Sequence, residues 1–306
     1  MHSLQSPSAV VMIRPHAFAS NPETSHDNAF QTLAQTSSQA TSSTALQEHD
    51  EAVYQLRAAG ITVHVFDDHG NLDTPDSVFP NNWFSTHPGG HVAIYPMFAP
   101  SRRRERRDDV IKLLKQEYRV QDVIDYSGLE QDNLALEGTG AMVLDHVGRI
   151  AYTVKSNRAD PVLLERFCTH FNYEPIAFQA KESAGRDVYH TNVLMGIGTQ
   201  YALICLDMIP DQERRATVRA RLEESGRKIV ELSHAQIAEF AGNAIELNGK
   251  NGLVLALSSR ALSSLTPEQL SIIENSARLL PLSVPTIETA GGSVRCMIAG
   301  IHLSRR

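Results

Sequence analysis

The chain has 306 residues, of which 42% are hydrophobic and 21% charged, and its formal net charge is −7. This is an ordinary globular composition, long enough for one large domain or two smaller ones. The acidic balance argues against nucleic acid as the main partner. No apolar run reaches the roughly 18 residues of a membrane span, so no membrane association is expected.

The N-terminus and the cysteines indicate the compartment. The first 15 residues lack a basic start followed by a long apolar core, so no signal peptide is expected. Cys168, Cys205 and Cys296 have no metal-ligand spacing and leave an odd thiol. This number and spacing of cysteines fits a protein of the reducing cytosol better than one held by disulfides. We therefore expect a cytoplasmic protein, and no metal site.

The N-terminal part is expected to fold as strand, loop and helix. Residues 9–14, Ala-Val-Val-Met-Ile-Arg, form an apolar run typical of a buried strand. Residues 15–28 are polar and rich in turn formers, which favours a loop able to lie over a pocket. The Ser-, Thr- and Gln-rich residues 31–44 suggest disorder by composition. Helical spacing nevertheless favours a helix over residues 45–59, ended by Gly60.

An arginine run stands out in the next part of the chain. Residues 102–107, Arg-Arg-Arg-Glu-Arg-Arg, resemble a nucleic-acid patch when taken alone. Acidic residues are interspersed, however, and the whole protein is acidic. We therefore interpret the run as the solvated start of an amphipathic helix that extends to Tyr118.

Short strands alternate with helices over the rest of the chain. The Gly-rich residues 136–140 lack the spacing of a phosphate loop, so no nucleotide and no other cofactor is expected. Expected strands are 61–66, 91–95, 120–125, 150–154, 201–206, 228–232, 243–247, 253–257 and 282–284, and expected helices are 161–171, 214–225, 233–240 and 267–277. This order is typical of the α/β class. Exact internal repeats are not visible, and there is no dinucleotide-binding fingerprint.

Three turn-to-strand stretches each place one polar residue in an apolar frame: Glu137, His190 and Cys296. Cys296 follows a Gly-Gly-Ser turn, which can hold a thiol at the mouth of a pocket, although cysteine often simply fills core. A thiolate nucleophile needs an activating base, and His190 is the one histidine in a loop that leads into an apolar strand. The alternative for His190 is a core histidine whose hydrogen bonds are satisfied within the protein, and the alternative for Glu137 is an ordinary turn carboxylate.

The other histidines have less specific explanations. His64 and His91 alternate on expected strands, whereas His49, His69 and His146 are expected to be solvated.

Together these stretches resemble the guanidine-modifying enzyme superfamily, which contains arginine deiminases, dimethylargininases, agmatine deiminases and amidinotransferases. The resemblance covers most of the chain in the same order and is closest at the nucleophile loop. The matching segments are Asp76-Ser77-Val78-Phe79 with Asn81-Asn82, Leu136-Glu137-Gly138, Ser156-Asn157-Arg158, His190-Thr191-Asn192 and Gly291-Gly292-Ser293-Val294-Arg295-Cys296. The resemblance implies the pentein fold, a five-bladed α/β propeller with a central active-site channel. We expect residues 1–306 to form one such catalytic domain.

The resemblance also implies roles for individual residues. Cys296 would be the nucleophile, His190 the general acid/base and Glu137 a substrate-orienting carboxylate. Arg158 would bind the α-carboxylate of the substrate. Asn243, in the loop after the expected helix that ends near Phe240, is a further candidate for substrate contact.

Two departures from the family pattern bear on the substrate. Deiminases have aspartates at the positions of Asn82 and Asn192, and these aspartates grip a guanidinium cation. Two amides leave such a buried cation poorly compensated, which costs several kcal/mol. A neutral ureido group offers both donors and an acceptor, which an amide matches. The alternative is that both asparagines only cap loops.

The pattern of Phe-Pro-Asn-Asn-Trp-Phe and His-Thr-Asn is most similar to the citrulline-hydrolase (citrullinase) branch. It predicts hydrolysis of citrulline to ornithine, carbon dioxide and ammonia through a carbamoyl group on Cys296. Arginine dihydrolase or deiminase activity, amidinotransfer, and a non-catalytic pentein binding protein stay open as alternatives. The expected partner is a small amino acid, and the oligomeric state is open, a homo-oligomer included.

Overall fold

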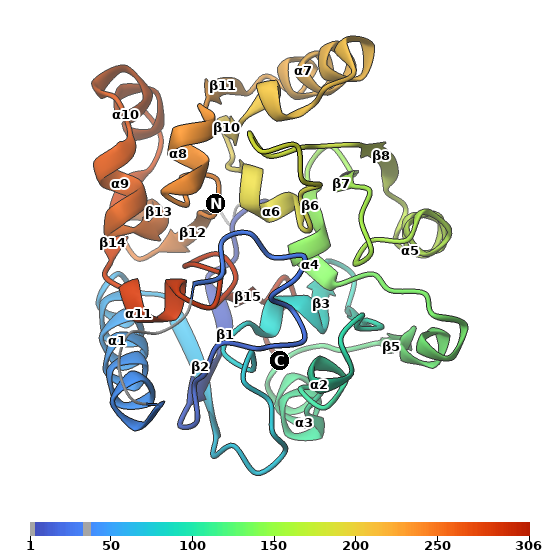
Figure 1. The fold of residues 1–306 in the computed structure, drawn as a ribbon, viewed down its shortest axis with the longest axis vertical. Coiled ribbons are helices and arrows are strands. Elements are labelled where there is room, and N and C mark those ends of the chain that lie inside the picture. Colours follow the sequence, from blue (N-terminus) through green and yellow to red (C-terminus); the bar gives the residue numbers. More distant parts are fainter. Residues whose placement is uncertain (1–3, 33–37) are drawn as a thin grey trace.

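The computed structural model describes residues 4–32 and 38–306 (Figure 1). Five three-stranded sheets surround a common centre. In each sheet an inner strand pairs antiparallel with a middle strand, and the middle strand pairs parallel with an outer strand.

The sheets, written from inner to outer strand, follow one another along the chain. They are β3 (Phe84–His87), β4 (His91–Ile94) and β5 (Asp122–Asp125); β6 (Met142–Asp145), β7 (Ile150–Val154) and β8 (Glu174–Phe178); β9 (Met195–Ile197), β10 (Tyr201–Ile204) and β11 (Lys228–Glu231); β12 (Ile245–Gly249), β13 (Gly252–Ser258) and β14 (Arg278–Leu282); and β15 (Ala299–Gly300), β1 (Ala9–Pro15) and β2 (Thr62–Asp68).

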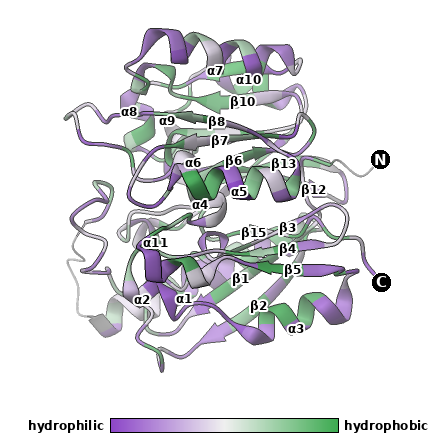
Figure 2. Ribbon diagram, turned by 90° about the vertical axis from the view of Figure 1, so that its right-hand side faces the viewer, coloured by the Kyte–Doolittle hydropathy of each residue, from purple (hydrophilic) through white to green (hydrophobic). Residues whose placement is uncertain are grey.

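Helices cross from each middle strand to the parallel outer strand, as parallel pairing requires. They lie at the outside of the ring (Figure 1) and are α1 (Ser38–Ala58), α2 (Pro100–Arg103) with α3 (Asp108–Glu117), α5 (Pro161–Phe171), η3 (Leu206–Met208) with α7 (Gln212–Glu224), and α9 (Ser259–Ser264) with α10 (Pro267–Glu274). In α3 hydrophobic and hydrophilic residues alternate (Figure 2), and Val110 and Leu114 are the buried ones. Shorter elements connect one sheet to the next: η1 (Pro80–Asn82), η2 (Ser127–Asp132), α4 (Gly138–Ala141), α6 (Thr191–Leu194), α8 (His234–Ala238) and α11 (Pro285–Glu288).

Both ends of the described chain complete the same sheet. The C-terminal strand β15 pairs with β1 through Val10↔Gly300 and Val11↔Ala299, which closes the ring. The expected pentein propeller, an α/β fold of five blades, is therefore confirmed. No helix in the described ranges is long and apolar enough to cross a membrane.

Some expected elements differ from the structure. The helix expected from residue 45 begins at Ser38, while residues 33–37 of the polar segment lie outside the described part. The strand expected over residues 282–284 is Arg278–Leu282. The single helix expected after the arginine run is broken, because α2 ends at Arg103 and α3 begins at Asp108.

Candidate active site

The short turn before each inner strand supplies one or more of the predicted site residues. Asn82 precedes β3, Glu137 precedes β6, His190 and Asn192 precede β9, Asn243 precedes β12 and Cys296 precedes β15. Each turn enters the centre of the ring from its own sheet, so residues more than 200 positions apart in sequence, such as Asn82 and Cys296, line one cavity. The repeat of the fold thus assembles the predicted set except Arg158, which follows the middle strand β7.

Two side-chain amides hold the sulfur of Cys296. The Nδ2 atoms of Asn192 and Asn243 each donate to Sγ at 3.2 Å, and the Oδ1 atom of Asn243 accepts from the Cys296 backbone N–H at 3.4 Å. Only 3% of Cys296 is exposed. Donors of this kind stabilise a thiolate more than a thiol, because the charged sulfur is the stronger acceptor.

His190 is oriented by Glu137. Its Nε2 atom lies 2.8 Å from Glu137 Oε2, and both side chains are buried. Burial favours a raised pKa for Glu137, but the positive charge of Arg158 and the hydrogen bond from His190 outweigh burial and bring that pKa to about 2. An ionised Glu137 fixes the proton on Nε2 and leaves Nδ1 for proton exchange. Burial lowers the pKa of His190, so the ring is neutral at neutral pH and can act as a base.

Two arginines flank the carboxylate of Glu137. Arg158 Nη1 lies 3.8 Å and Arg102 Nη1 3.7 Å from Glu137 Oε2. Arg102 is itself held by Glu105 in a bidentate pair, with both distances 2.9 Å, and lies 3.8 Å from Asp76. The site therefore contains two buried guanidinium groups with their counter-charges already in place.

Asn82 faces Arg102. In the amide orientation that satisfies its neighbours, the oxygen accepts from Arg102 Nη1 and Nη2 at 2.8 and 3.1 Å, and the nitrogen donates to Asn81 Oδ1 at 3.1 Å. Asn82 lines the cavity, but both ends of its amide already have protein partners. Gly140 permits this arrangement, because a Cβ there would lie 2.1 Å from the amide nitrogen of Asn82 in this orientation and 2.8 Å from His190 Nδ1.

The loop over residues 16–30 covers the site. Asp27 pairs with Arg158 through two oxygens, and Thr24 and Asn28 line the cavity together with Cys296. The Arg158 guanidinium also lies over the Tyr189 ring at 4.7 Å. The cavity has a volume of about 20 Å³, which holds about one or two waters. An amino acid enters only when this loop moves.

The structure brings all seven predicted residues together. The Arg158 guanidinium, however, is already paired with the carboxylate of Asp27. The structure adds Arg102 and Asp27, which sequence reasoning did not select, and Asp76, which was named only as part of a segment that matches the family. The solvated helix start expected for the arginine run is wrong for Arg102 and Glu105, since both are buried at 2% and 4% exposure. The break after Arg103 turns Arg102 inward, and the Arg–Glu spacing of three residues was the available signal.

The remaining cysteines, Cys168 and Cys205, are core residues. Burial raises the pKa of Cys168 to about 12 and that of Cys205 to about 11, which makes both poor nucleophiles. Over residues 4–32 and 38–306, no group of three or more His, Cys, Asp or Glu side chains could hold a metal ion.

Comparison with known proteins places this site in a family. Residues 14–303 match the family model described as N,N dimethylarginine dimethylhydrolase, eukaryotic. The chain belongs to this family. It is thus a pentein of the guanidine-modifying superfamily, as the resemblance implied. No curated protein sequence matches the chain.

Solved structures share the fold at low sequence identity. The N-terminal domain of ArgZ, an arginine dihydrolase from the ornithine-ammonia cycle in cyanobacteria, has a TM-score of 0.74 at 15% identity, with 96% of this chain and 99% of that chain covered. Unliganded AgrE has a TM-score of 0.73 at 15% identity, covering 95% of this chain and 38% of AgrE. A dimethylarginine dimethylaminohydrolase adduct has a TM-score of 0.65 at 14% identity, covering 98% and 100%. The chain spans 40% of complete ArgZ.

Proposed function

We propose that residues 1–306 form one catalytic domain that hydrolyses a ureido or guanidino amino acid through Cys296, and that the substrate is citrulline. The observation that supports citrulline is the amide pair on the sulfur. Asn192 and Asn243 are neutral, and within the described ranges no carboxylate hydrogen-bonds Sγ. The Oδ1 atom of Asn192 is buried without a partner in the same ranges, which makes it an acceptor for a substrate N–H.

The proposed reaction uses one nucleophile and one proton carrier. Neutral His190 first takes the proton of the Cys296 thiol, and the resulting thiolate attacks the ureido carbon. The tetrahedral intermediate then expels the δ-amine of ornithine, which takes that proton from His190. This leaves a carbamoyl group bonded to sulfur. His190 then takes a proton from water, which attacks the carbamoyl carbon and releases the thiolate and carbamate. Carbamate decays to carbon dioxide and ammonia.

Positioning of the substrate is assigned to the arginines. Arg158, with Arg102 beside it, is the proposed partner of the α-carboxylate, and Glu137 orients His190. Asn82 acts through Arg102, because its amide is bonded to that side chain. Asn243 acts on the nucleophile through contacts to both the sulfur and the backbone N–H of Cys296.

Arginine is the second candidate, and Asp76 supports it. This carboxylate lines the cavity together with Cys296 and can pair with a guanidinium. ArgZ, which shares the fold, is described as an arginine dihydrolase. Asp76 is, however, already bonded to Asn21 at 2.8 Å and lies 3.8 Å from Arg102. Amidinotransfer would require an amine acceptor, and a non-catalytic role would leave the ordered Cys, His and Glu set without a use.

The test is turnover of single substrates. Purified protein is incubated with citrulline, arginine or dimethylarginine, and ornithine and citrulline are quantified, with a further arm that contains arginine and glycine. We expect ornithine from citrulline, none from Cys296→Ala, and undiminished turnover from Cys205→Ala, which changes a buried thiol outside the site. Rapid turnover of arginine without activity on citrulline would overturn the choice of substrate.

A further inference from the structure

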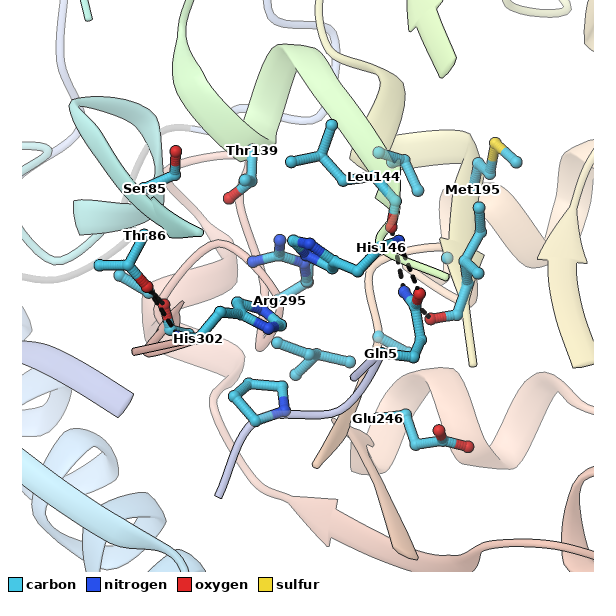
Figure 3. Close-up of a pocket in the computed structure, with 18 of the residues that line it drawn as sticks. Gln5, Ser85, Thr86, Thr139, Leu144, His146, Met195, Glu246, Arg295 and His302 are labelled. Carbon is cyan, nitrogen blue, oxygen red and sulfur yellow. Dashed lines mark hydrogen bonds between the residues drawn. The ribbon is translucent and has the colours of Figure 1, made fainter. Parts of the chain in front are cut away.

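A second cavity lies in the central channel. It has a volume of about 50 Å³ and is lined by the inner strands of all five sheets (Figure 3). Its lining includes Thr86 of β3, Leu144 of β6, Met195 of β9, Glu246 of β12 and Gly300 of β15. Arg295 also lines it, whereas the next residue, Cys296, lines the substrate cavity. Consecutive residues of one turn thus serve two different cavities.

Arg295 is a buried cation without a carboxylate partner, and the anion that acts on it is the thiolate of the neighbouring Cys296. The Nη1 atom of Arg295 donates to the backbone oxygen of Ile298 at 3.0 Å, and in the described part of the chain no carboxylate lies within ion-pair distance of its guanidinium. Burial lowers the pKa of Arg295 to about 10, so the side chain stays protonated at neutral pH. A buried charge without a partner is costly, and a guanidinium presents a fork that fits two oxygens of one anion.

The imidazoles around Arg295 are neutral. The rings of His146 and His302 lie side by side (Figure 3), with their centroids 3.8 Å apart. The centroid of the His87 ring lies 6.2 Å from that of His146. Burial, and after it the charge of Arg295, brings the pKa of His302 to about 4. Burial also lowers the pKa of His146 and His87 well below the ordinary range. The expectation that His146 is solvated is wrong, since it is 8% exposed.

The one carboxylate that lines this cavity is held elsewhere. Glu246 Oε1 accepts from the Ser6 hydroxyl at 2.5 Å and from the Thr199 backbone N–H at 2.7 Å. These donors satisfy Oε1, whereas Glu246 Oε2 is buried without a hydrogen-bond partner in the described ranges. The hydroxyls of Thr86 and Thr139 already donate to backbone oxygens, so the Arg295 guanidinium and the neutral imidazoles are the groups left to donate to an anion.

We propose that this cavity binds a small planar oxyanion of the bicarbonate and carbamate class through the Arg295 guanidinium. The volume supports this size, because it corresponds to about three to five waters and excludes an amino acid. Carbamate is the one-carbon product of the hydrolysis proposed above, and bicarbonate is the hydrated form of the carbon dioxide to which it decays, so the assignment of the anion as product rests on that function. Amino acid and one-carbon product would then occupy opposite sides of the nucleophile turn.

Thermal unfolding tests the site without turnover. The Cys296→Ala protein is unfolded in sodium bicarbonate and in sodium chloride at equal ionic strength and pH. We expect bicarbonate to raise Tm by about 2 °C or more relative to chloride. The rise should be lost in Cys296→Ala with Arg295→Met. It should persist with Arg260→Met, which removes an exposed arginine paired with Glu239 outside the cavity. An equal rise with and without Arg295, or no rise at all, would overturn the proposal.

A second variant and a second readout guard against misfolding of Arg295→Met. Val143→Phe fills the cavity from β6 without changing a charge, and it should also abolish the bicarbonate shift. In turnover assays bicarbonate should inhibit without raising KM for the amino acid, whereas competitive inhibition would place bicarbonate in the substrate cavity and refute the proposal. A protein inactive on citrulline that keeps the Arg295-dependent shift would overturn the proposed function and leave the anion site standing.

Discussion

The sulfur of Cys296 is contacted by two neutral amides. Asn192 and Asn243 donate to it from the turns that precede two different sheets, so the proposed nucleophile is oriented only when both turns are in place. Neutral donors lower the energy of the thiolate without adding a negative charge beside it. This is the reason for proposing a neutral ureido group rather than a guanidinium cation as the substrate.

Substituting Asn192→Asp should shift the substrate preference toward arginine. The carboxylate compensates a guanidinium but repels the thiolate, so we expect lower kcat/KM for citrulline and a rise of about tenfold or more in the arginine-to-citrulline ratio of kcat/KM. Steady-state kinetics on both amino acids measures that ratio. Asn275→Asp, in the turn after α10, is the matched control and should leave it unchanged. A ratio that falls would contradict the role given to Asn192.

Replacing Glu137 with Gln should move the pH dependence of the reaction. The Glu137 carboxylate raises the pKa of His190 against the lowering by burial, so its removal lowers that pKa further. The acidic limb of the kcat/KM profile should therefore shift to lower pH, and the rate should fall by about 10²- to 10⁴-fold because the base is weaker and less oriented. Glu117→Gln, at the exposed end of α3, is the control. An unshifted acidic limb would show that another group titrates.

Individual candidate site residues could be predicted where both the residue type and its neighbours in the sequence were distinctive. Cys296 followed a Gly-Gly-Ser turn, and His190 and Glu137 gained weight from their order along the chain. Arg102 could not be found in this way, because its burial depends on a helix break and on partners such as Asp76, 26 residues away. A local run of arginines carries no information about which one turns inward.

At the level of elements, the loop over residues 16–30 controls access to the site. Its polar composition correctly predicted a loop, and the structure shows what holds it down. Asp27 reaches across to Arg158, whose guanidinium is also the proposed partner of the substrate carboxylate. The substrate and the loop therefore compete for one cation.

Asp27→Asn should open the site more often. Loss of a charged hydrogen-bonded partner weakens the closed state by about 1.5–3 kcal/mol, so we expect alkylation of Cys296 by iodoacetamide to become about tenfold faster or more. Mass spectrometry of the Cys296 peptide measures the rate. Asp187→Asn, which removes an exposed partner of Lys181 in another loop, should leave it unchanged. Equal rates in all three proteins would show that the loop opens without breaking the Asp27 pair.

The predicted bounds agree best with the structure for helices and strands that have strong local sequence signals. The helix Pro161–Phe171 was predicted with its observed bounds, since Asp160 caps its start and Pro161 occupies the first turn. The helix Ser38–Ala58 was predicted too short, because its first turns are rich in Ser and Thr, which are weak helix formers. Tertiary contacts hold those turns, since Ser42 Oγ donates to the backbone oxygen of Phe18 and Thr41 is buried, and no local pattern reports such contacts.

At the scale of the whole molecule, the five sheets repeat one pattern of strands, but the sequence shows no exact repeat. The repeated units share strand order and direction rather than residues. The inner strands are only two to five residues long, which leaves little sequence in which a repeat could be recognised. Closure of the ring by β15 on β1 depends on residues about 290 positions apart and cannot be inferred from local patterns.

Neighbouring blades are joined by ion pairs of two kinds, and burial should decide their contribution to stability. Asp145 at the end of β6 pairs with Arg227, just before β11, at 2.6 and 3.0 Å, with side chains 0% and 2% exposed. Glu174 of β8 and Arg221 of α7 join the same two blades at the surface, 51% and 32% exposed. Asp145→Ala should lower the free energy of unfolding by about 3–5 kcal/mol, because Arg227 is left buried and unpaired.

Glu174→Gln is the matched control, and it should cost less than about 1 kcal/mol because solvent screens the surface pair. Urea unfolding of both variants and of the unmodified protein measures the difference, with the m-value as a check that the same surface is exposed. Equally small losses would show that the blades are held together by apolar packing, with the buried pair contributing little. A loss confined to Asp145→Ala would make this pair a principal link between adjacent blades of the ring.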